Sequence, residues 1–187
     1  MQPLLTMPQV WTFEDLQAID VEDWRRYEIV DGALVVSPST GFRHEVVSAL
    51  VREVISAALP PELIVVGPMA VDLAPSYRIP DLLVVPRRLA VTDIKLLRPA
   101  DLPLVVEVVS PGSVTTDRIT KPAQYAAAGI GAYWWVETKP EVSLTAYVLR
   151  EGANVYTELG TWTSGQIAQL IEPFTVEVTI DRLTLTP

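Results

Sequence analysis

Two acidic residues in this sequence lie within or next to apolar runs of the kind that form buried strands. Glu107 is in the middle of the apolar run 104–109, and Asp81 directly follows Pro80 at the start of the apolar run 81–85. An ionised carboxylate inside such a strand is costly unless it is paired, hydrogen-bonded or bound to a cation. If the two strands are neighbours, the carboxylates meet at one end of the sheet. Such a pair of oxygen donors suits a hard divalent cation such as Mg²⁺ or Mn²⁺.

Each acid also has a purely structural interpretation. Asp81 after a proline could be a turn residue or the first residue of a strand. Glu107 could form a structural ion pair with Arg87, Arg118 or Lys121. The hypothesis of a metal site therefore depends on both acids together and on the residues around them.

A lysine follows the second acid in the next predicted helix. Lys121 could reach back to the mouth of the sheet, where its ammonium group would hold a nucleophilic water or stabilise an anionic transition state. The plain alternative is a solvated lysine on a helix surface. Tyr125 follows four residues later on the same helix face, and we expect it to pack in the core.

Two further polar residues are second-rank candidates for the site. His44 falls among the apolar residues of a long predicted helix, so it points toward the covered side. A hydrogen-bonded core or capping role is the alternative for this single histidine. Glu28 begins a predicted hairpin and could add a third carboxylate, or it could pair with Arg25 or Arg26 at the surface.

The composition excludes several other chemistries. The 187 residues include no cysteine and one histidine, so disulfides, thiolate zinc sites and multi-histidine metal sites are excluded. The sequence contains no glycine-rich phosphate loop, no nucleophile elbow and no His-Glu-x-x-His motif. The net charge of −9 disfavours binding of nucleic acid through a bulk positive field, but it allows a local basic groove or a metal-bridged phosphate.

Length and hydropathy predict one compact domain over residues 1–187. No apolar run approaches the roughly 18 residues of a membrane helix. The first residues lack the basic flank and long apolar stretch of a secretory signal. We therefore expect a cytoplasmic protein that is not bound to a membrane.

The elements that must position these residues alternate in type. An Asp-Gly pair between two β-prone runs, 27–30 and 33–37, predicts a hairpin. Helices are predicted over about 12–19, 43–59 and 116–128. Strands are predicted over 63–66, 69–73, 79–85, 104–109, 133–136, 143–149, 154–158 and 174–180. This order indicates an α/β or α+β fold in which a mixed β-sheet is flanked by helices.

Taken in order, these motifs resemble the Uma-two family, which is assigned to the restriction-endonuclease-like PD-(D/E)xK superfamily. The resemblance spans about residues 10–180, and the order and spacing of the motifs carry it rather than any one of them. The matching positions are Tyr27-Glu28-Ile29-Val30-Asp31-Gly32, His44, Pro80-Asp81, Glu107-Val108-Val109-Ser110-Pro111, Asp117-Arg118, Lys121, Tyr125, Gly129 and Tyr133-Trp134-Trp135-Val136.

The resemblance implies metal-assisted hydrolysis of DNA phosphodiester bonds. Asp81 and Glu107 would match the two acids that bind Mg²⁺ or Mn²⁺, while Glu28 and His44 match positions near the site. The lysine that the superfamily places two residues after the second acid is Val109 here. The resemblance implies that this lysine has moved to Lys121, where it would position the attacking water.

A protein of another class fits the same residues. The acidic net charge and the valine in the lysine position are also expected of a catalytically inactive nuclease fold that binds or regulates. A homodimer is expected for either class, because the edge strands of the β-rich C-terminal part need cover. A hydrolase acting on a substrate other than nucleic acid has no support beyond the two acids.

Overall fold

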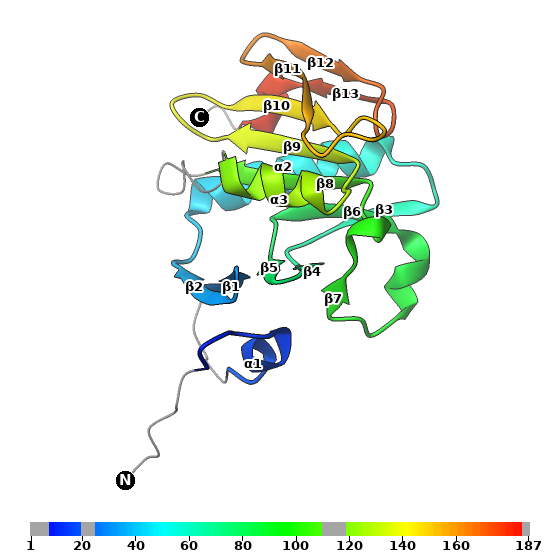
Figure 1. The fold of residues 1–187 in the computed structure, drawn as a ribbon. Helices are drawn as coiled ribbons and strands as arrows, with labels where there is room; N and C mark the ends of the chain where they lie inside the picture. Colours follow the sequence, from blue (N-terminus) through cyan, green and yellow to red (C-terminus); the bar gives the residue numbers. More distant parts are fainter. Residues whose placement is uncertain (1–7, 20–24, 110–118, 185–187) are drawn as a thin grey trace.

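The computed structural model describes residues 8–19, 25–109 and 119–184. Its centre is a six-stranded sheet in the order β11-β10-β9-β8-β6-β3. Helix α2 (Phe42–Ala58) covers one face of this sheet, and helix α3 (Lys121–Ala127) lies on the other face (Figure 1). The strands are β3 (Leu63–Val66), β6 (Leu82–Pro86), β8 (Leu104–Val109), β9 (Ala132–Glu137), β10 (Ser143–Val148) and β11 (Thr157–Trp162).

A second sheet lies below the first in Figure 1, in the order β2-β1-β5-β4-β7. Its strands are β1 (Arg26–Val30), β2 (Ala33–Ser37), β4 (Ala70–Leu73), β5 (Ser76–Arg78) and β7 (Leu96–Leu97). The short helix α1 (Phe13–Gln17) packs beneath it, and the hairpin of β12 (Ile167–Leu170) and β13 (Val176–Thr179) lies at the other end of the molecule. Three 3-10 segments complete the described structure: η1 (Arg87–Val91), η2 (Pro99–Asp101) and η4 (Ile180–Leu183).

Strand β8 is buried along its whole length because both faces of the sheet are covered. Val106 belongs to the apolar cluster under α2, and Val105 belongs to the cluster on the α3 side. The strand pairs antiparallel with β6 and parallel with β9. This double cover explains the unbroken apolar run in the sequence, and it makes Glu107 a carboxylate inside the core.

Helix α2 follows from the apolar spacing of its sequence. Val47, Val51 and Ile55 recur every four residues and are buried against the central sheet. The helix ends where Leu59 turns to an extended conformation, as expected for a residue that precedes a proline. One end of α2 thereby carries His44 to the edge of the core, where it is also buried.

The predicted fold class is confirmed, and several predicted boundaries are wrong. The strand predicted over 79–85 begins only at Leu82, as β6, because residues 79–81 connect it to β5 in the other sheet. Strand β5, which ends at Arg78, is not predicted. The strand predicted over 154–158 begins three residues later, and β12 is not predicted at all. The first part of the helix predicted over 116–128 lies outside the described residues. None of the helices within the described part of the chain is long and apolar enough to cross a membrane.

Candidate active site

Asp81 lies directly before β6, at the end of the central sheet that faces the smaller sheet. Strand β6 pairs with β8 so that Leu82 is opposite Val106, which places Asp81 beside the position of Glu107 across the ladder. One oxygen of Asp81, Oδ2, accepts a hydrogen bond from the backbone N–H of Val108 at 2.8 Å. The Asp81 side chain is thereby tied to the backbone of the residue that follows the second acid.

Two further groups hold the Asp81 carboxylate. His44 Nε2 lies 3.1 Å from Oδ2, and Arg26 Nη1 lies 2.8 Å from Oδ1. Burial acts to raise the pKa of Asp81, but the hydrogen bond to His44, the charge of Arg26 and the N–H of Val108 lower it below its ordinary value. Asp81 is therefore an anion at neutral pH although it is only 6% exposed.

Glu107 is held from the opposite side, by helix α3. Oε1 of this 2% exposed carboxylate accepts a hydrogen bond from the Tyr125 hydroxyl at 2.8 Å and forms an ion pair with Lys121 Nζ at 3.0 Å. Burial and the nearby negative charge of Glu107 raise the pKa of Tyr125 well above its ordinary value. The phenol therefore stays protonated and keeps donating to the carboxylate.

The expected superfamily pattern has a lysine two residues after the second acid, where this chain has Val109. Val109, two residues after Glu107, is buried in the apolar cluster on the α3 side. Lys121 is instead the first residue of α3, and its ammonium group meets the carboxylate of Glu107. The structure therefore brings Lys121 to the second acid, and its role there stays a prediction.

Arg26 links the two acids electrostatically. Its guanidinium pairs with Asp81, and its Nη1 also donates to the carbonyl oxygen of Ile79 at 3.3 Å. Burial acts to lower the pKa of Arg26, but the charges of Asp81, Glu107 and Glu28 raise it further above its ordinary value. The charges of three carboxylates therefore act on one arginine at this end of the sheet.

His44 is hydrogen-bonded to the Asp81 carboxylate, which Arg26 also contacts. Burial disfavours the charged imidazole, but the hydrogen bond to Asp81 and the negative charge of that residue outweigh it, so the pKa of His44 is raised. The imidazole acts as a partner of the acid rather than as a separate core residue.

Glu28 lies in the described site, but its oxygens are already engaged. Oε1 accepts the backbone N–H of Ile79 at 2.8 Å, and Oε2 accepts from Arg78 Nη1 at 3.2 Å. The alternative of a surface pair with Arg25 or Arg26 is wrong, because Glu28 is buried and its ion-pair partner is Arg78. Glu28 therefore fixes the backbone that leads to Asp81.

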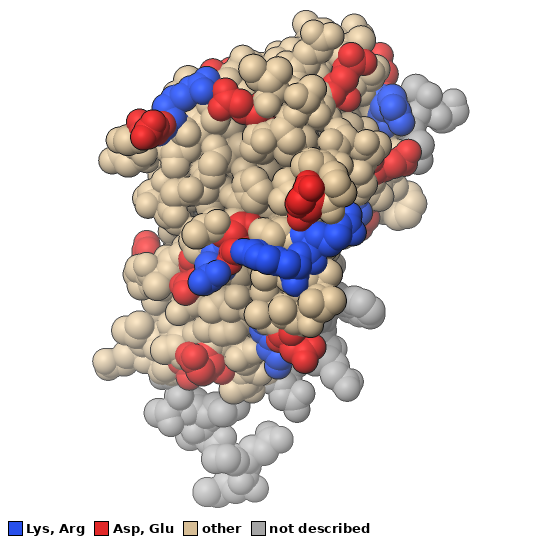
Figure 2. All heavy atoms as spheres, turned by 90° about the vertical axis from the view of Figure 1, so that its right-hand side faces the viewer, with Lys and Arg blue, Asp and Glu red and all other residues tan. Residues whose placement is uncertain are grey.

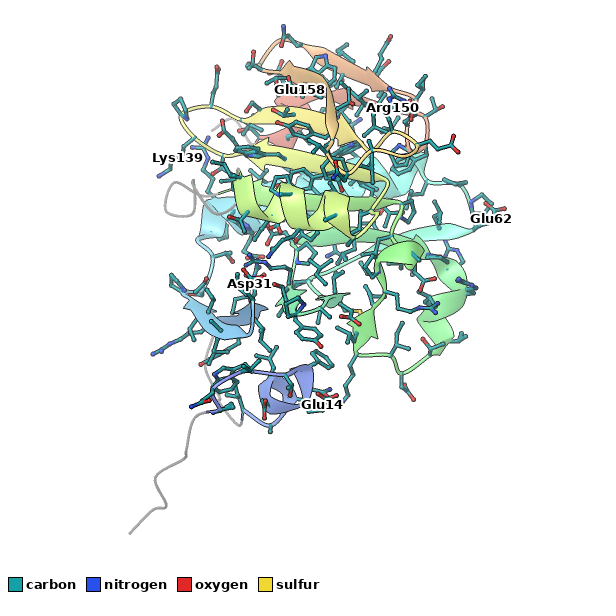
Figure 3. The ribbon with its side chains drawn as sticks, in the orientation of Figure 1. Glu14, Asp31, Glu62, Lys139, Arg150 and Glu158 are labelled. Atoms are coloured by element: carbon teal, nitrogen blue, oxygen red, sulfur yellow. The ribbon has the colours of Figure 1, made fainter. Side chains whose placement is uncertain are left out.

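A polar network extends this support toward α3. Arg78 Nε donates to the side-chain oxygen of Gln124 at 2.9 Å, and the amide nitrogen of Gln124 donates to Ser76 Oγ at 3.2 Å. Ser76 in turn donates to Asp31 Oδ1 at 3.2 Å. Asp31, labelled in Figure 3, is an exposed residue of the turn between β1 and β2. The network joins the smaller sheet to the helix that carries Lys121.

Three residues of the site are not among the predicted candidates. Arg26 and Arg78 lie on strands of the second sheet, and the sequence gives no signal of which acid each arginine meets. Tyr125 was expected to pack in the core, and it does, but its hydroxyl also holds Glu107. The four-residue spacing from Lys121 was a usable signal, because both side chains leave the same face of α3 and reach the same carboxylate.

The donor set fits a magnesium-type ion that retains several waters. Within the described ranges, no three histidine or acidic side chains are grouped closely enough to hold a metal by themselves. Mg²⁺ is commonly bound through one or two carboxylates, with waters and substrate oxygens completing its shell. Asp81 and Glu107 are the two buried carboxylates that could serve, and Arg26 would have to give up its contact with Asp81 Oδ1.

The face of the molecule shown in Figure 2 carries no broad positive patch. On the face shown in Figure 2, lysines and arginines run in a band across the middle, with acidic side chains lying against them. Among the ion pairs of the described residues, Asp101 pairs with both Arg88 and Arg98. Contacts to a polyanion would therefore have to be local.

The fold of this chain is shared with a protein of known structure. A solved structure from Anabaena variabilis ATCC 29413, described as a "putative nuclease belonging to DUF820", superposes with a TM-score of 0.70. The two sequences are 14% identical, and the match covers 91% of this chain and 95% of the other. At that identity the likeness establishes the fold alone.

The family follows from the sequence match. The model of the Uma2 family, whose description is "Putative restriction endonuclease", matches residues 12–185, and the chain belongs to that family. The resemblance expected from the sequence motifs is confirmed. A search of curated proteins finds no match.

Proposed function

We propose that this protein is a divalent-metal-dependent nuclease that hydrolyses phosphodiester bonds of DNA. The observation that carries the proposal is the pair of buried carboxylates at one end of the central sheet. Asp81 is bonded to the backbone N–H of Val108, the residue next to Glu107, and a lysine reaches Glu107 from α3. Membership of a family described as restriction endonucleases supports the same chemistry.

In this proposal Asp81 and Glu107 hold a Mg²⁺ or Mn²⁺ ion. When bound, the ion would polarise the phosphate, lower the pKa of a water and offset the charge that develops on phosphorus. Tyr125 keeps Glu107 in place through its hydroxyl, and His44 with the N–H of Val108 keeps Asp81 in place. These fixed partners orient the two carboxylates before a substrate arrives.

In this proposal Lys121 positions the attacking water. Its Nζ is 3.0 Å from Glu107 and only 8% of its side chain is exposed, so the ammonium group is held at the acid rather than spread in solvent. From there it would hold a water for attack or stabilise charge on the phosphate oxygens. Arg26, once displaced from Asp81, would be free to contact a phosphate oxygen.

Cleavage assays test the proposal directly. Plasmid, single-stranded and branched DNA would be incubated with the full chain in Mg²⁺ or Mn²⁺ and in EDTA. Metal-dependent cleavage that is lost in Asp81→Asn, Glu107→Gln and Lys121→Met is expected. The matched control is Asp101→Asn, which removes another buried acid that is paired with Arg88 and Arg98. Cleavage that survives both acid substitutions would rule out this site.

A second candidate function has its own supporting observation. Both acids are already paired with basic side chains, Asp81 with Arg26 and Glu107 with Lys121. A nuclease fold neutralised in this way could serve binding or regulation without catalysis, and a homodimer remains a prediction for either function. Calorimetric titration separates the two: Mn²⁺ binding that is lost in Asp81→Asn favours the nuclease, and no binding to either protein favours the inactive fold.

A further inference from the structure

A pocket of about 170 Å³ opens beside Asp81, on the side of the sheet that α2 covers. One water needs roughly 10–15 Å³ of such space, so the pocket has room for a larger polar group. The side chains of one helix and of the strand region around the acid supply its polar lining: Arg26, His44, Glu45, Ser48, Arg52 and Asp81.

Three polar atoms of this lining are buried without a hydrogen-bond partner. One is Oδ1 of Asp81, which forms an ion pair with Arg26, and the other two are Nδ1 of His44 and the hydroxyl oxygen of Ser48. The Glu45 carboxylate lies 3.5 Å from His44 Nδ1, which is too long for a good hydrogen bond. Buried polar groups in folded proteins almost always have partners, so these two atoms point to a group that is bound there.

Arg52 adds donors to the same pocket. One of its nitrogens, Nη2, donates to the carbonyl oxygen of Gly67 at 3.0 Å, which holds the guanidinium against the pocket wall. A guanidinium has five N–H donors, and the contact with Gly67 is the one that the described part of the chain provides for Arg52. The remaining donors are available to an acceptor with several oxygens.

The unused donors of the lining favour a ligand with several acceptor oxygens. Asp81 is matched by Arg26, and Glu45 accepts a hydrogen bond from Thr40. Arg52 then supplies N–H donors that no described residue besides Gly67 accepts, next to the unpartnered hydroxyl of Ser48. A phosphate group has the size and the number of acceptors to satisfy these donors.

We propose that this pocket binds a phosphate group of the nucleic acid strand, next to the phosphate that is hydrolysed at the two acids. The inference rests on the proposed nuclease function for the identity of the strand, because the pocket and the candidate metal site share Asp81 and Arg26. Arg52 and Ser48 lie on α2 and have no contact with Glu107 or Lys121 among the interactions described. They position the strand, and they do not take part in the cleavage step.

Titration of inorganic phosphate into the full chain tests the pocket without metal or substrate. EDTA is present, and ionic strength is held constant with NaCl so that general screening does not change. The wild type is expected to bind phosphate, Arg52→Gln to bind about tenfold more weakly, and Ser48→Ala to bind about threefold more weakly. The matched control is Arg43→Gln, which removes an exposed arginine of the same helix that does not line the pocket, and it should bind as the wild type does.

Two results would overturn the proposal. One is a wild type that takes up no phosphate, and the other is equal affinity in Arg52→Gln and Arg43→Gln. Ser48→Ala keeps the test decisive if Arg52→Gln folds poorly after losing its contact with Gly67. Near-ultraviolet circular dichroism of each variant shows whether the fold is intact.

A second arm identifies the source of the phosphate. The Glu107→Gln variant, which keeps all pocket residues, would be titrated by fluorescence anisotropy with one oligonucleotide carrying either a 5′-phosphate or a 5′-hydroxyl. Equal binding that weakens when Arg52→Gln is added assigns the pocket to an internal phosphate. Tighter binding of the phosphorylated strand assigns it to the strand end. Binding of both strands that is indifferent to Arg52 would overturn the assignment to nucleic acid.

The failure of this inference is distinguishable from that of the proposed function. A protein that never cleaves DNA but binds phosphate through Arg52 retains the pocket and loses the nuclease function. A protein that cleaves DNA with the same KM in wild type and Arg52→Gln retains the nuclease function and loses the pocket. In the expected case Arg52→Gln raises KM and leaves kcat within about threefold of the wild type.

Discussion

Arg26 and His44 contact different oxygens of the Asp81 carboxylate. Arg26 Nη1 lies 2.8 Å from Oδ1, whereas His44 and the backbone N–H of Val108 in β8 contact Oδ2. A cation that binds Asp81 must therefore share this carboxylate with an arginine. The contact connects the candidate metal site to the neighbouring pocket, because Arg26 also lines that pocket. Arg26 can therefore either remain paired with Asp81 at the candidate metal site or turn toward the pocket.

Replacement of Arg26 should strengthen metal binding. The substitution Arg26→Gln removes a positive charge that acts on both Asp81 and Glu107, and one charge at about 4 Å is worth roughly 4 kcal/mol near a protein surface before compensation. We expect Mn²⁺ to bind about tenfold more tightly by calorimetry, since retained polar contacts and water offset most of that energy. Arg182→Gln, which removes an exposed arginine, is the control. Unchanged or weaker binding in Arg26→Gln would contradict the competition.

The Tyr125 hydroxyl should stabilise the folded protein through Glu107. Tyr125→Phe keeps the ring and removes one hydrogen bond to a buried charged group, so we expect a loss of about 1.5–3 kcal/mol in the free energy of unfolding. Tyr156→Phe removes a hydroxyl that donates to the neutral carbonyl of Ile130, and a loss of only about 0.5–1.5 kcal/mol is expected there. Urea unfolding in EDTA measures both. Equal losses in the two variants would show that the charge of Glu107 adds nothing.

The two acids could be predicted from sequence because each interrupts a local pattern. An acid in the driest strand and an acid after a proline are visible without knowledge of the fold, and the pairing of β6 with β8 then brings them together. The arginines could not be predicted. Arg26 and Arg78 meet their acids through the pairing of β1 with β5, a long-range contact at Ile29 and Tyr77 that no local periodicity encodes. Ile79 extends the apolar run that becomes β6, which is why that strand is predicted to begin three residues too early.

Gly67 should be required for the position of Asp81. Its φ is +141°, and a Cβ built there would lie 2.3 Å from the backbone oxygen of Asp81 and 3.0 Å from the Cα of Leu82. Gly67→Ala must therefore move the backbone that carries the first acid, and we expect a loss of about 2 kcal/mol or more in stability together with weaker metal binding. Gly131→Ala meets only an ordinary contact at 3.5 Å and should change stability by no more than about 1 kcal/mol. Similar stability for the two variants would contradict this account.

His44 should make the stability of the metal-free protein depend on pH. Its pKa in the folded state is raised, so its contribution is fully present below the ordinary histidine pKa of about 6.5 and is lost as pH rises through the higher folded value. Because the chain has a single histidine, His44→Gln should flatten the fall in stability above pH 6.5. Urea unfolding in EDTA from pH 5.5 to 8.5, compared between wild type and variant, measures the difference. Parallel curves would mean that the imidazole titrates alike in both states.

The role of Glu28 can be separated from that of a metal ligand. Both of its oxygens are bonded, to the N–H of Ile79 and to the buried Arg78, so Glu28→Gln leaves an arginine without its charge partner. We expect a loss of about 3 kcal/mol in the free energy of unfolding, because removing one member of a buried ion pair leaves an uncompensated charge. Mn²⁺ affinity should stay within about threefold of the wild type, whereas Asp81→Asn should lower it about tenfold or more. Equal loss of Mn²⁺ binding in the two variants would make Glu28 a third ligand.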